Sequence, residues 1–458
     1  MDILNADAAI VGAGQAGPFL AMALAARAEK VVLVEAQHLG GTCINSGCTP
    51  TKTLRKSARV AYIARRAADF GVHVGSVEVD FAAAMQRMQQ RVDEARAGLE
   101  KWIAAEPNVT LLRAWGRFTG KGTDGFELQA GERAVRAKRV FLNTGTRAFH
   151  PPIPGLADVT ALDNVSLLQL RERPAHLVIL GGSYIGLEMG QIFRRLGSAV
   201  TVIEPGPRIT AREEPEVSQC LAEFLQAEGV RVLAGQAPQR VERDGDGIAV
   251  QVGAERVTGS HLLVATGRLP NTGQLGLDTV GVRTDERGYV PTNGRLETNV
   301  PGIWALGDIN KRGAFTHTSY HDQEIVAANL AGGARSADER TMAYAMFTDP
   351  PLGRVGMGVA EARASGKRVL VADYAMKNVS RAKEESETIG LVKLLVDADS
   401  ERFLGASIVG INADEIIQVI SNFMATGASY RVLKEALPVH PTVAEFLPTI
   451  LGKLRPLV

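Results

Sequence analysis

The chain alternates short apolar runs with longer stretches of helical character. Residues 8–11 are all apolar, and a glycine-rich turn, an alanine-rich stretch and a second apolar run at residues 31–34 follow them. The same order returns with mostly apolar runs at residues 176–180 and 199–203. Such runs, separated by helical segments, are typical of the buried parallel strands of an α/β sheet. We therefore predict two strand–helix–strand units of the same kind.

A long helix is predicted between the two units, over residues 80–104. Asp80 can cap its start. Apolar residues recur along it at helical spacing: Phe81, Met85, Met88, Val92, Leu99, Trp102 and Ile103. We interpret this stripe as core rather than as a contact surface for a cofactor.

The pattern changes twice more along the chain. Pro-rich residues 151–155 mark one boundary, and another piece begins near Met342. This last piece shows predicted strands at 391–396 and 403–409 and an amphipathic helix from Asp414 to about residue 426. It contains strands and helices but lacks a glycine-rich phosphate loop.

Composition narrows the class of protein. The 458 residues are 45% hydrophobic and 22% charged, which excludes a disordered chain, a coiled coil and a membrane protein. The formal net charge is +1, so nothing favours nucleic acid or an anionic membrane as a partner. The first residues enter a strand at once and lack the basic start and apolar run of a signal peptide. We therefore expect a cytoplasmic location.

The first glycine-rich turn has the spacing of a dinucleotide-binding loop. Gly12 allows a tight turn, Gly14 allows the backbone to approach a pyrophosphate, and Gly17 allows helix and strand to pack closely. Glu35 ends the next predicted strand and can accept hydrogen bonds from a ribose diol. An ordinary strand-to-helix turn is the alternative.

The second glycine-rich turn repeats this arrangement. Gly181 and Gly186 occupy the outer positions, and Glu204 follows the first glycine at the same distance as in the first unit. Ser183 replaces the middle glycine. A lone motif of this kind is weak evidence, but two copies in the same strand–helix context predict two dinucleotide sites.

Two of the three cysteines stand close together. Cys43 and Cys48 are separated by four residues in a glycine-flanked segment that enters a predicted helix. They can form a small disulfide loop, and a helix N-terminus lowers a thiol pKa. A zinc half-site is the alternative, but it needs two more ligands. Cys220 lies in a helical stretch and is interpreted as a small buried hydrophobic residue.

The segment GGTCINSGCTPTK at residues 40–52 closely resembles the redox motif of the class I pyridine nucleotide–disulfide oxidoreductases. This family includes lipoamide dehydrogenase, glutathione reductase, trypanothione reductase and mercuric reductase. The resemblance covers essentially the whole chain. This chain departs from the family pattern at two positions: Thr51 stands where serine is usual, and Ser183 stands in place of the middle glycine of the second glycine-rich turn. Its further motifs are GAGQAG at 12–17, GGSYIGLE at 181–188, ATGRLPN at 265–271, IWALGDI at 303–309 and HPTVAE at 440–445.

The resemblance implies two cofactor sites. The residues expected to bind FAD are Gly12, Gly14, Gly17, Glu35, Gly41, Thr42, Lys52, Thr144, Gly145, Asp308, Thr316 and His317. The residues expected to bind NAD(P)H are Gly181, Ser183, Tyr184, Ile185, Gly186, Glu204, Gly267 and Arg268. Because a carboxylate repels a 2′-phosphate, Glu204 favours NADH over NADPH, although Arg208 and Arg212 could reverse the preference.

The resemblance also implies catalytic roles. Cys48 is expected nearer the flavin, and Cys43 is expected to attack the substrate. Tyr184 is expected to gate the nicotinamide pocket, and Glu188 to pair with Lys52. From the residues alone, an ordinary helix face is the favoured interpretation of Tyr184 and Glu188.

Two histidine pairings are candidates for chemistry. His440, oriented by Glu445, can supply a proton to a leaving thiolate, and in the family this histidine serves the other subunit. A histidine before proline is otherwise usually structural. His317 and His321 could form a metal face, but they lie in the flavin segment, so we expect no metal site.

These features predict an α/β fold with two Rossmann-like dinucleotide-binding domains, for FAD and NAD(P), and a C-terminal α+β dimerisation domain. The expected divisions are 1–150 (FAD, first part), 151–271 (NAD(P)), 272–341 (FAD, second part) and 342–458 (dimerisation). The last residues, 453–458, lack the adjacent cysteines with which mercuric reductases receive Hg(II).

The expected function is electron transfer from NAD(P)H through FAD and Cys43–Cys48 to a small disulfide, in a homodimer with shared active sites. One alternative is the reduction of a metal ion, Hg(II) or Cu(II), which the FTDPP segment at 347–351 and residues 380–382 favour. An alternative of another class is a flavin-binding redox sensor without turnover.

Overall fold

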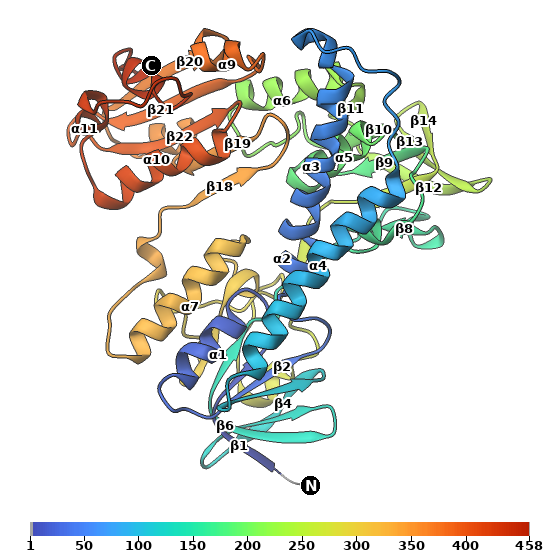
Figure 1. Cartoon of the computed structure of the whole chain (residues 1–458). Coiled ribbons are helices and arrows are strands. Elements are labelled where there is room, and N and C mark those ends of the chain that lie inside the picture. The colour runs from blue at the N-terminus through green and yellow to red at the C-terminus, as the bar shows by residue number, and fades with distance from the viewer. Residues whose placement is uncertain (1–2, 458) are drawn as a thin grey trace.

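The computed structural model describes residues 3–457, which fold into three lobes (Figure 1). The N-terminal lobe lies at the bottom of the view, the second lobe at the upper right, and the C-terminal lobe at the upper left. No helix within residues 3–457 combines the length and the apolar character needed to cross a bilayer.

The N-terminal lobe is built on a seven-stranded sheet in the order β3-β2-β1-β6-β5-β4, with β17 also paired to β6. The first predicted unit is confirmed, since β1 and β2 are parallel and α1 connects them. Helices α1 and α7 pack on the same core. The elements are β1 (Ile3–Val11), α1 (Gly17–Ala25), β2 (Val31–Glu35), β3 (Val109–Arg113), β4 (Gly116–Gly122), β5 (Gly125–Ala130), β6 (Arg133–Leu142), β17 (Ile303–Ala305) and α7 (Thr316–Leu330).

The second lobe is built on a five-stranded parallel sheet in the order β11-β10-β9-β15-β8. Its centre is the second predicted unit. A three-stranded antiparallel sheet and the β7–β16 pair accompany it. The elements are β7 (Thr146–Ala148), β8 (Ala161–Leu162), β9 (His176–Leu180), α5 (Tyr184–Arg195), β10 (Ala199–Glu204), α6 (Pro215–Ala227), β11 (Val230–Ala234), β12 (Pro238–Asp244), β13 (Gly247–Val252), β14 (Glu255–Gly259), β15 (His261–Val264) and β16 (Arg268–Pro270).

Helix α4 (Phe81–Ala104) runs from the second lobe to the N-terminal lobe (Figure 1). Its predicted start is confirmed, because Oδ1 of Asp80 accepts a hydrogen bond from the Ala83 amide at 2.9 Å. The predicted stripe is largely confirmed as core. Trp102 is the exception. It is 38% exposed, and its ring packs against Phe19 at the surface, with 5.2 Å between ring centroids.

The C-terminal lobe has a six-stranded antiparallel sheet in the order β18-β19-β22-β21-β20-β23. Both predicted strands and the predicted helix are present, as β21, β22 and α10. Every residue of β22 is buried, which fits its largely apolar sequence. The elements are β18 (Ala343–Met346), β19 (Leu352–Gly356), α8 (Val359–Ala364), β20 (Val369–Ala375), α9 (Ser380–Glu384), β21 (Leu391–Asp397), β22 (Phe403–Val409), α10 (Ala413–Thr426), α11 (Tyr430–Glu435), α12 (Phe446–Leu451) and β23 (Arg455–Pro456).

Candidate active site

The cysteine segment consists of two helices rather than one. Cys43 lies in the short helix α2 (Gly41–Ser46), the backbone breaks at Gly47, and Cys48 opens α3 (Cys48–Arg65). A side chain at Gly41 would come within 2.9 Å of the Cα of Gly14. The segment therefore lies directly against the first glycine-rich turn.

The two thiols have opposite acidities. The Cys43 thiol hydrogen-bonds Cys48 and lowers the pKa of Cys48 to about 6, against burial, which acts to raise it. The Thr316 hydroxyl, 3.2 Å from the Cys48 sulfur, and the charge of Lys52 act in the same direction as Cys43. The same hydrogen bond, together with burial, raises the pKa of Cys43. In the reduced pair, Cys48 therefore holds the negative charge and Cys43 holds the proton.

Lys52 and Glu188 form the expected pair. Nζ of Lys52 lies 2.8 Å from Oε2 of Glu188, which joins α3 to α5. The other oxygen of Glu188 accepts a hydrogen bond from the Phe347 amide at 2.8 Å. The Lys52 ammonium also lies 4.4 Å from the centroid of the Phe347 ring, a cation–π distance. This geometry favours the functional interpretation of Glu188 over an ordinary helix face.

A buried charge network fixes α3 further along its length, and the sequence did not indicate it. The Asp349 carboxylate pairs with Arg59 of α3 at 2.7 Å and with Arg195 of α5. Although burial acts to raise the pKa of Asp349, the charges of Arg195 and Arg59 lower it overall. Arg55 donates to the carbonyl of Thr348 at 2.9 Å. The helix that begins at Cys48 is thus anchored to both neighbouring lobes.

The first glycine-rich turn is held by Asn143, a residue that sequence reasoning missed. Its buried Oδ1 accepts from the amides of Ala16 and Gly17 at 3.3 and 3.1 Å, and its Nδ2 donates to the carbonyl of Leu306 at 2.9 Å. The one available signal was its position directly before the predicted Thr144–Gly145 pair. Glu35 accepts from the Ala13 amide at 2.7 Å, so its carboxylate lies at the mouth of the turn.

The second glycine-rich turn is organised in the same way. Glu204 accepts hydrogen bonds from the amides of Gly182 and Gly206, each at 2.7 Å. Ser183 precedes α5 in an extended conformation, and Ile185 lies in the first turn of the helix. A side chain at Gly186 would approach the Gly181 carbonyl oxygen to 2.0 Å, so close helix–strand packing requires glycine there.

The remaining predicted cofactor residues meet near the start of α7. Thr146 donates to Asp308 at 2.9 Å, and Nε of Arg268 donates to Thr146 at 2.6 Å. The structure also describes the backbone at four further predicted residues. Thr144 is hydrogen-bonded to Asn271 in both directions, Gly145 and Gly267 have positive φ angles of 63° and 135°, and Thr42 lies in α2.

The residues present fit FAD. Two helix N-termini, at Gly17 of α1 and Thr316 of α7, offer positive dipole ends toward anionic groups. The carboxylates of Glu35 and Asp308 can accept hydrogen bonds from sugar or ribityl hydroxyls. The side chain of His317 is occupied, since its Nε2 lies 2.7 Å from the carbonyl oxygen of Ala343, so only its main chain can serve a cofactor.

Tyr184 makes a contact that the sequence did not indicate. Its hydroxyl donates to Oε1 of Glu213 at 2.7 Å, and the hydroxyl of Tyr344 donates to the same atom at 2.8 Å. Oε2 of Glu213 pairs with Arg354 at 3.1 Å. Burial and the charge of Glu213 raise the pKa of both tyrosines, so both hydroxyls stay protonated.

His440 and Glu445 lie together at the surface. Their side chains are 2.9 Å apart, and the His440 side chain is 75% exposed. Within residues 3–457, no hydrogen bond joins His440 to Cys43 or Cys48 of the same chain. Among the described residues, the exposed His440–Glu445 pair is therefore not hydrogen-bonded to the cysteine pair of its own chain.

The histidines considered for a metal face are engaged otherwise. The ring nitrogens of His321 lie 2.9 Å from Arg335 and 3.1 Å from Arg340. Across the described part of the chain, no three histidine, cysteine, aspartate or glutamate side chains are grouped so that they could hold a metal ion.

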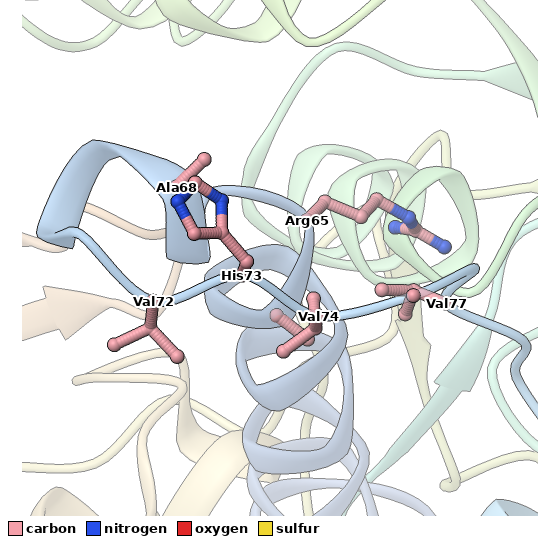
Figure 2. Close-up of a pocket in the computed structure, with 8 residues that line it drawn as sticks. Arg65, Ala68, Val72, His73, Val74 and Val77 are labelled. Atoms are coloured by element: carbon pink, nitrogen blue, oxygen red, sulfur yellow. The ribbon is translucent and has the colours of Figure 1, made fainter.

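A cavity of about 290 Å³ lies away from these residues, at the opposite end of α3 from Cys48 (Figure 2). The close-up shows the side chains of Arg65 and His73 among those that line it. Arg65 is already bound to the carbonyl of Arg195 at 2.6 Å. None of the predicted site residues lines this cavity. Its lining residues are Ala64, Arg65, Ala68, Val72, His73, Val74, Gly75 and Val77.

Two family models match the chain. Residues 6–323 match the model described as pyridine nucleotide-disulphide oxidoreductase, and residues 342–450 match the dimerisation domain of the same family. The second match supports a homodimer.

Relatives and solved structures also point to the family of these two models. The probable pyridine nucleotide-disulfide oxidoreductase RclA of Escherichia coli (strain K12) is 33% identical over 446 residues, which cover 96% of this chain and 97% of that protein. A mercuric reductase of Streptomyces lividans is 35% identical over 454 residues, with 96% and 94% covered. The solved Cu(II) complex of the HOCl-induced flavoprotein disulfide reductase RclA from Escherichia coli is 33% identical, with a TM-score of 0.89 and with 97% and 99% covered.

Proposed function

Because the chain belongs to the pyridine nucleotide–disulphide oxidoreductases, we propose that it reduces a small disulfide with electrons from NADH, by way of FAD and the Cys43–Cys48 pair. The opposite acidities of the two thiols carry this proposal. Cys48 has a pKa of about 6 and is available as a thiolate at neutral pH, while the raised pKa of Cys43 keeps its proton in place until a base removes it.

The chemistry of the pair follows from these acidities. When bound, FAD would supply the redox chemistry that passes the two electrons of a hydride from NADH to the Cys43–Cys48 disulfide. When the Cys43–Cys48 bond breaks, Cys48 receives the negative charge, which Lys52 and the N-terminus of α3 stabilise. Cys43 then attacks one sulfur of the substrate disulfide and forms a mixed disulfide. Cys48 attacks Cys43, re-forms the bridge and releases the second substrate thiol.

His440 of the partner subunit is proposed as the acid–base group. Cys43 must lose a proton before it attacks, and the first substrate thiolate must gain one as it leaves. Glu445 accepts from Nδ1 of His440, which fixes the tautomer and leaves Nε2 directed outward. Overall, one NADH and one proton convert one disulfide to two thiols.

The surface around His440 supports the sharing of sites between subunits. Leu437 and Val439 are 97% and 75% exposed, an unusual exposure for large apolar side chains in a soluble lobe. A hollow of about 420 Å³ lies between α10 and residues 442–444, which closely follow His440 in the chain. An apolar surface of this kind suits contact with a second copy of the chain.

The proposal also includes the domain boundaries at residues 150, 271 and 341 and a cytoplasmic location.

Metal-ion reduction is the second candidate. One solved relative is a Cu(II) complex, and other relatives are mercuric reductases. Thiolates are the ligands that soft metal ions prefer, and the Cys43–Cys48 pair offers two sulfurs. Among the described residues, no three histidine, cysteine, aspartate or glutamate side chains are grouped to hold a metal ion, so a metal substrate would depend on this pair and on the partner subunit.

A steady-state acceptor screen tests the function. The holoenzyme is given NADH with lipoamide, glutathione disulfide, other small disulfides, Hg(II), Cu(II) or quinones, and NADH oxidation is followed beside the Cys48→Ser variant. We expect at least one disulfide to be reduced by the wild type and not by the variant. Turnover with a metal ion alone would favour the second candidate. No thiol-dependent turnover with any acceptor would leave the redox sensor as the better account.

A further inference from the structure

Glu213 lies where the second lobe meets the C-terminal lobe, and its carboxylate is fully buried. It stands two residues before α6, in the second lobe. Tyr184 reaches it from the first residue of α5, while Tyr344 and Arg354 reach it from the C-terminal lobe. A buried carboxylate is costly unless it is paired and hydrogen-bonded, so these partners together account for its presence.

The bond between Glu213 and Tyr184 is of the strong kind. A hydroxyl that donates to an ionised carboxylate forms a hydrogen bond roughly twice as strong as one between neutral groups. The carboxylate is the acceptor for two tyrosine hydroxyls, each within 2.8 Å. Any rotation of Tyr184 away from its present position must break one of these bonds inside the protein.

The ring of Tyr184 also has a fixed resting place. Its centroid lies 5.6 Å from that of Tyr344, and Tyr344 stacks on Phe315 with 5.1 Å between centroids. Phe315 immediately precedes α7, whose first residue, Thr316, contacts Cys48. The row of rings therefore leads from the second nucleotide site to the start of α7.

We propose that Glu213 is a positioning residue that latches Tyr184 in its closed position and so sets the affinity for the nicotinamide nucleotide. The inference depends on the part of the proposed function that places the nucleotide beside Tyr184. A ligand that binds only the open form has its apparent affinity reduced by the fraction of open molecules. Weakening the latch raises this fraction and tightens binding.

The chain contains a matched control in the next residue. Glu214 is also buried and pairs with the same guanidinium of Arg354, at 2.6 Å. Its other contacts are the Ser407 hydroxyl at 3.0 Å and the Val359 amide at 3.2 Å, and it has no tyrosine partner. Glu213→Gln and Glu214→Gln therefore remove the same charge from the same arginine, but only the first loosens Tyr184.

The test is a titration of oxidised holoenzyme with NAD⁺, followed by flavin fluorescence in the absence of any acceptor. We expect Glu213→Gln to lower the Kd by roughly threefold to tenfold, the effect of weakening one charged hydrogen bond. In steady state, the KM for NADH falls and kcat stays unchanged. Glu214→Gln should leave the Kd within about twofold of wild type, although both variants lower the Tm.

A second variant keeps the test independent of the arginine pair. Tyr184→Phe retains the ring and removes only the hydroxyl, so it should reproduce the tighter binding of Glu213→Gln. The double variant should bind no more tightly than either single one, because both changes open the same latch. Unchanged binding in Glu213→Gln and Tyr184→Phe, or an equal change in Glu214→Gln, overturns the latch. Since no acceptor is present, a failure of disulfide turnover does not affect this result.

Discussion

The ammonium of Lys52 and the carboxylate of Glu188 lie 2.8 Å apart and act on Cys48 in opposite directions. The positive charge lowers the pKa of that thiol, and the negative charge raises it. The opposing effects of Lys52 and Glu188 on the pKa of Cys48 can therefore be tested by substituting each residue alone.

The first prediction follows from this pair. Lys52→Met should raise the pKa of Cys48, and Glu188→Gln should lower it, each by up to about 1 unit. The measurement is the rate of Cys48 alkylation against pH in reduced holoenzyme. The alkylation rate rises as pH passes the thiol pKa, so the two profiles should move to opposite sides of wild type. Shifts in the same direction contradict the assignment of charges.

The two cysteines should differ in their spectra. Cys43→Ser leaves Cys48 permanently reduced because it cannot form the bridge, and its thiolate beside oxidised flavin produces long-wavelength absorbance without any NADH. A serine hydroxyl can still donate to Cys48, so the absorbance should fade as pH falls through about 6, where the thiolate becomes protonated. Cys48→Ser should lack the absorbance. The opposite pattern would reverse the roles of the two cysteines.

Sharing of active sites can be tested with mixed dimers. A Cys43→Ser subunit combined with a His440→Ala subunit contains one site with intact cysteines and an intact partner histidine. We expect about half of the wild-type disulfide reductase activity per dimer, although each parent dimer is inactive. Two different affinity tags isolate the mixed species. Activity no higher than that of the parents excludes the shared site.

Nucleotide preference should depend on Glu204. Its carboxylate is held by the Gly182 and Gly206 amides, whereas Arg208 is turned toward the carbonyls of Ala211 and Glu213. We expect a higher kcat/KM with NADH than with NADPH, and Glu204→Gln should reduce the ratio by about tenfold or more. Arg212→Gln is the control, and it should leave the ratio unchanged. A wild-type preference for NADPH contradicts the assignment.

Asn143 should matter for both stability and FAD retention. Asn143→Ala leaves two helix amides and the Leu306 carbonyl without their buried partner, which costs about 2–3 kcal/mol. We expect a lower Tm and faster loss of FAD on dilution. Asn143→Asp keeps the acceptor and loses only the donor, so its effect should be intermediate. Equal behaviour of the two variants would show that the acceptor oxygen has no special role.

Sequence patterns predicted the features that depend on residues close together in the chain. The glycine-rich turns, the cysteine segment and the boundaries of α4 depend on residues close together in the chain, and the structure has these elements where they were expected. Two local details were still missed. The break at Gly47 divides the cysteine segment into α2 and α3, and Trp102 is partly exposed at the surface, where its ring contacts Phe19.

The residues that sequence reasoning missed are joined across long stretches of chain. Asn143 connects α1 to the strand β17 region, Asp349 connects α3 to α5, and Glu213 gathers side chains from two lobes. Each is an ordinary polar residue in its own segment. Its importance comes from burial beside distant partners, which no periodicity or short motif encodes.

The core around α3 and α4 takes its side chains from Leu54 at one end of the sequence to Val409 at the other. A ribosome that adds ~5–20 residues per second completes the first of these residues tens of seconds before the last. During that interval Leu54 and Met88 have been synthesised, but Met346, Leu352 and Val409 of the same core have not. The nascent chain thus passes through a stage in which apolar core residues are exposed and prone to aggregation. A truncated chain that ends before Val409 should therefore be a substrate for chaperones and proteases.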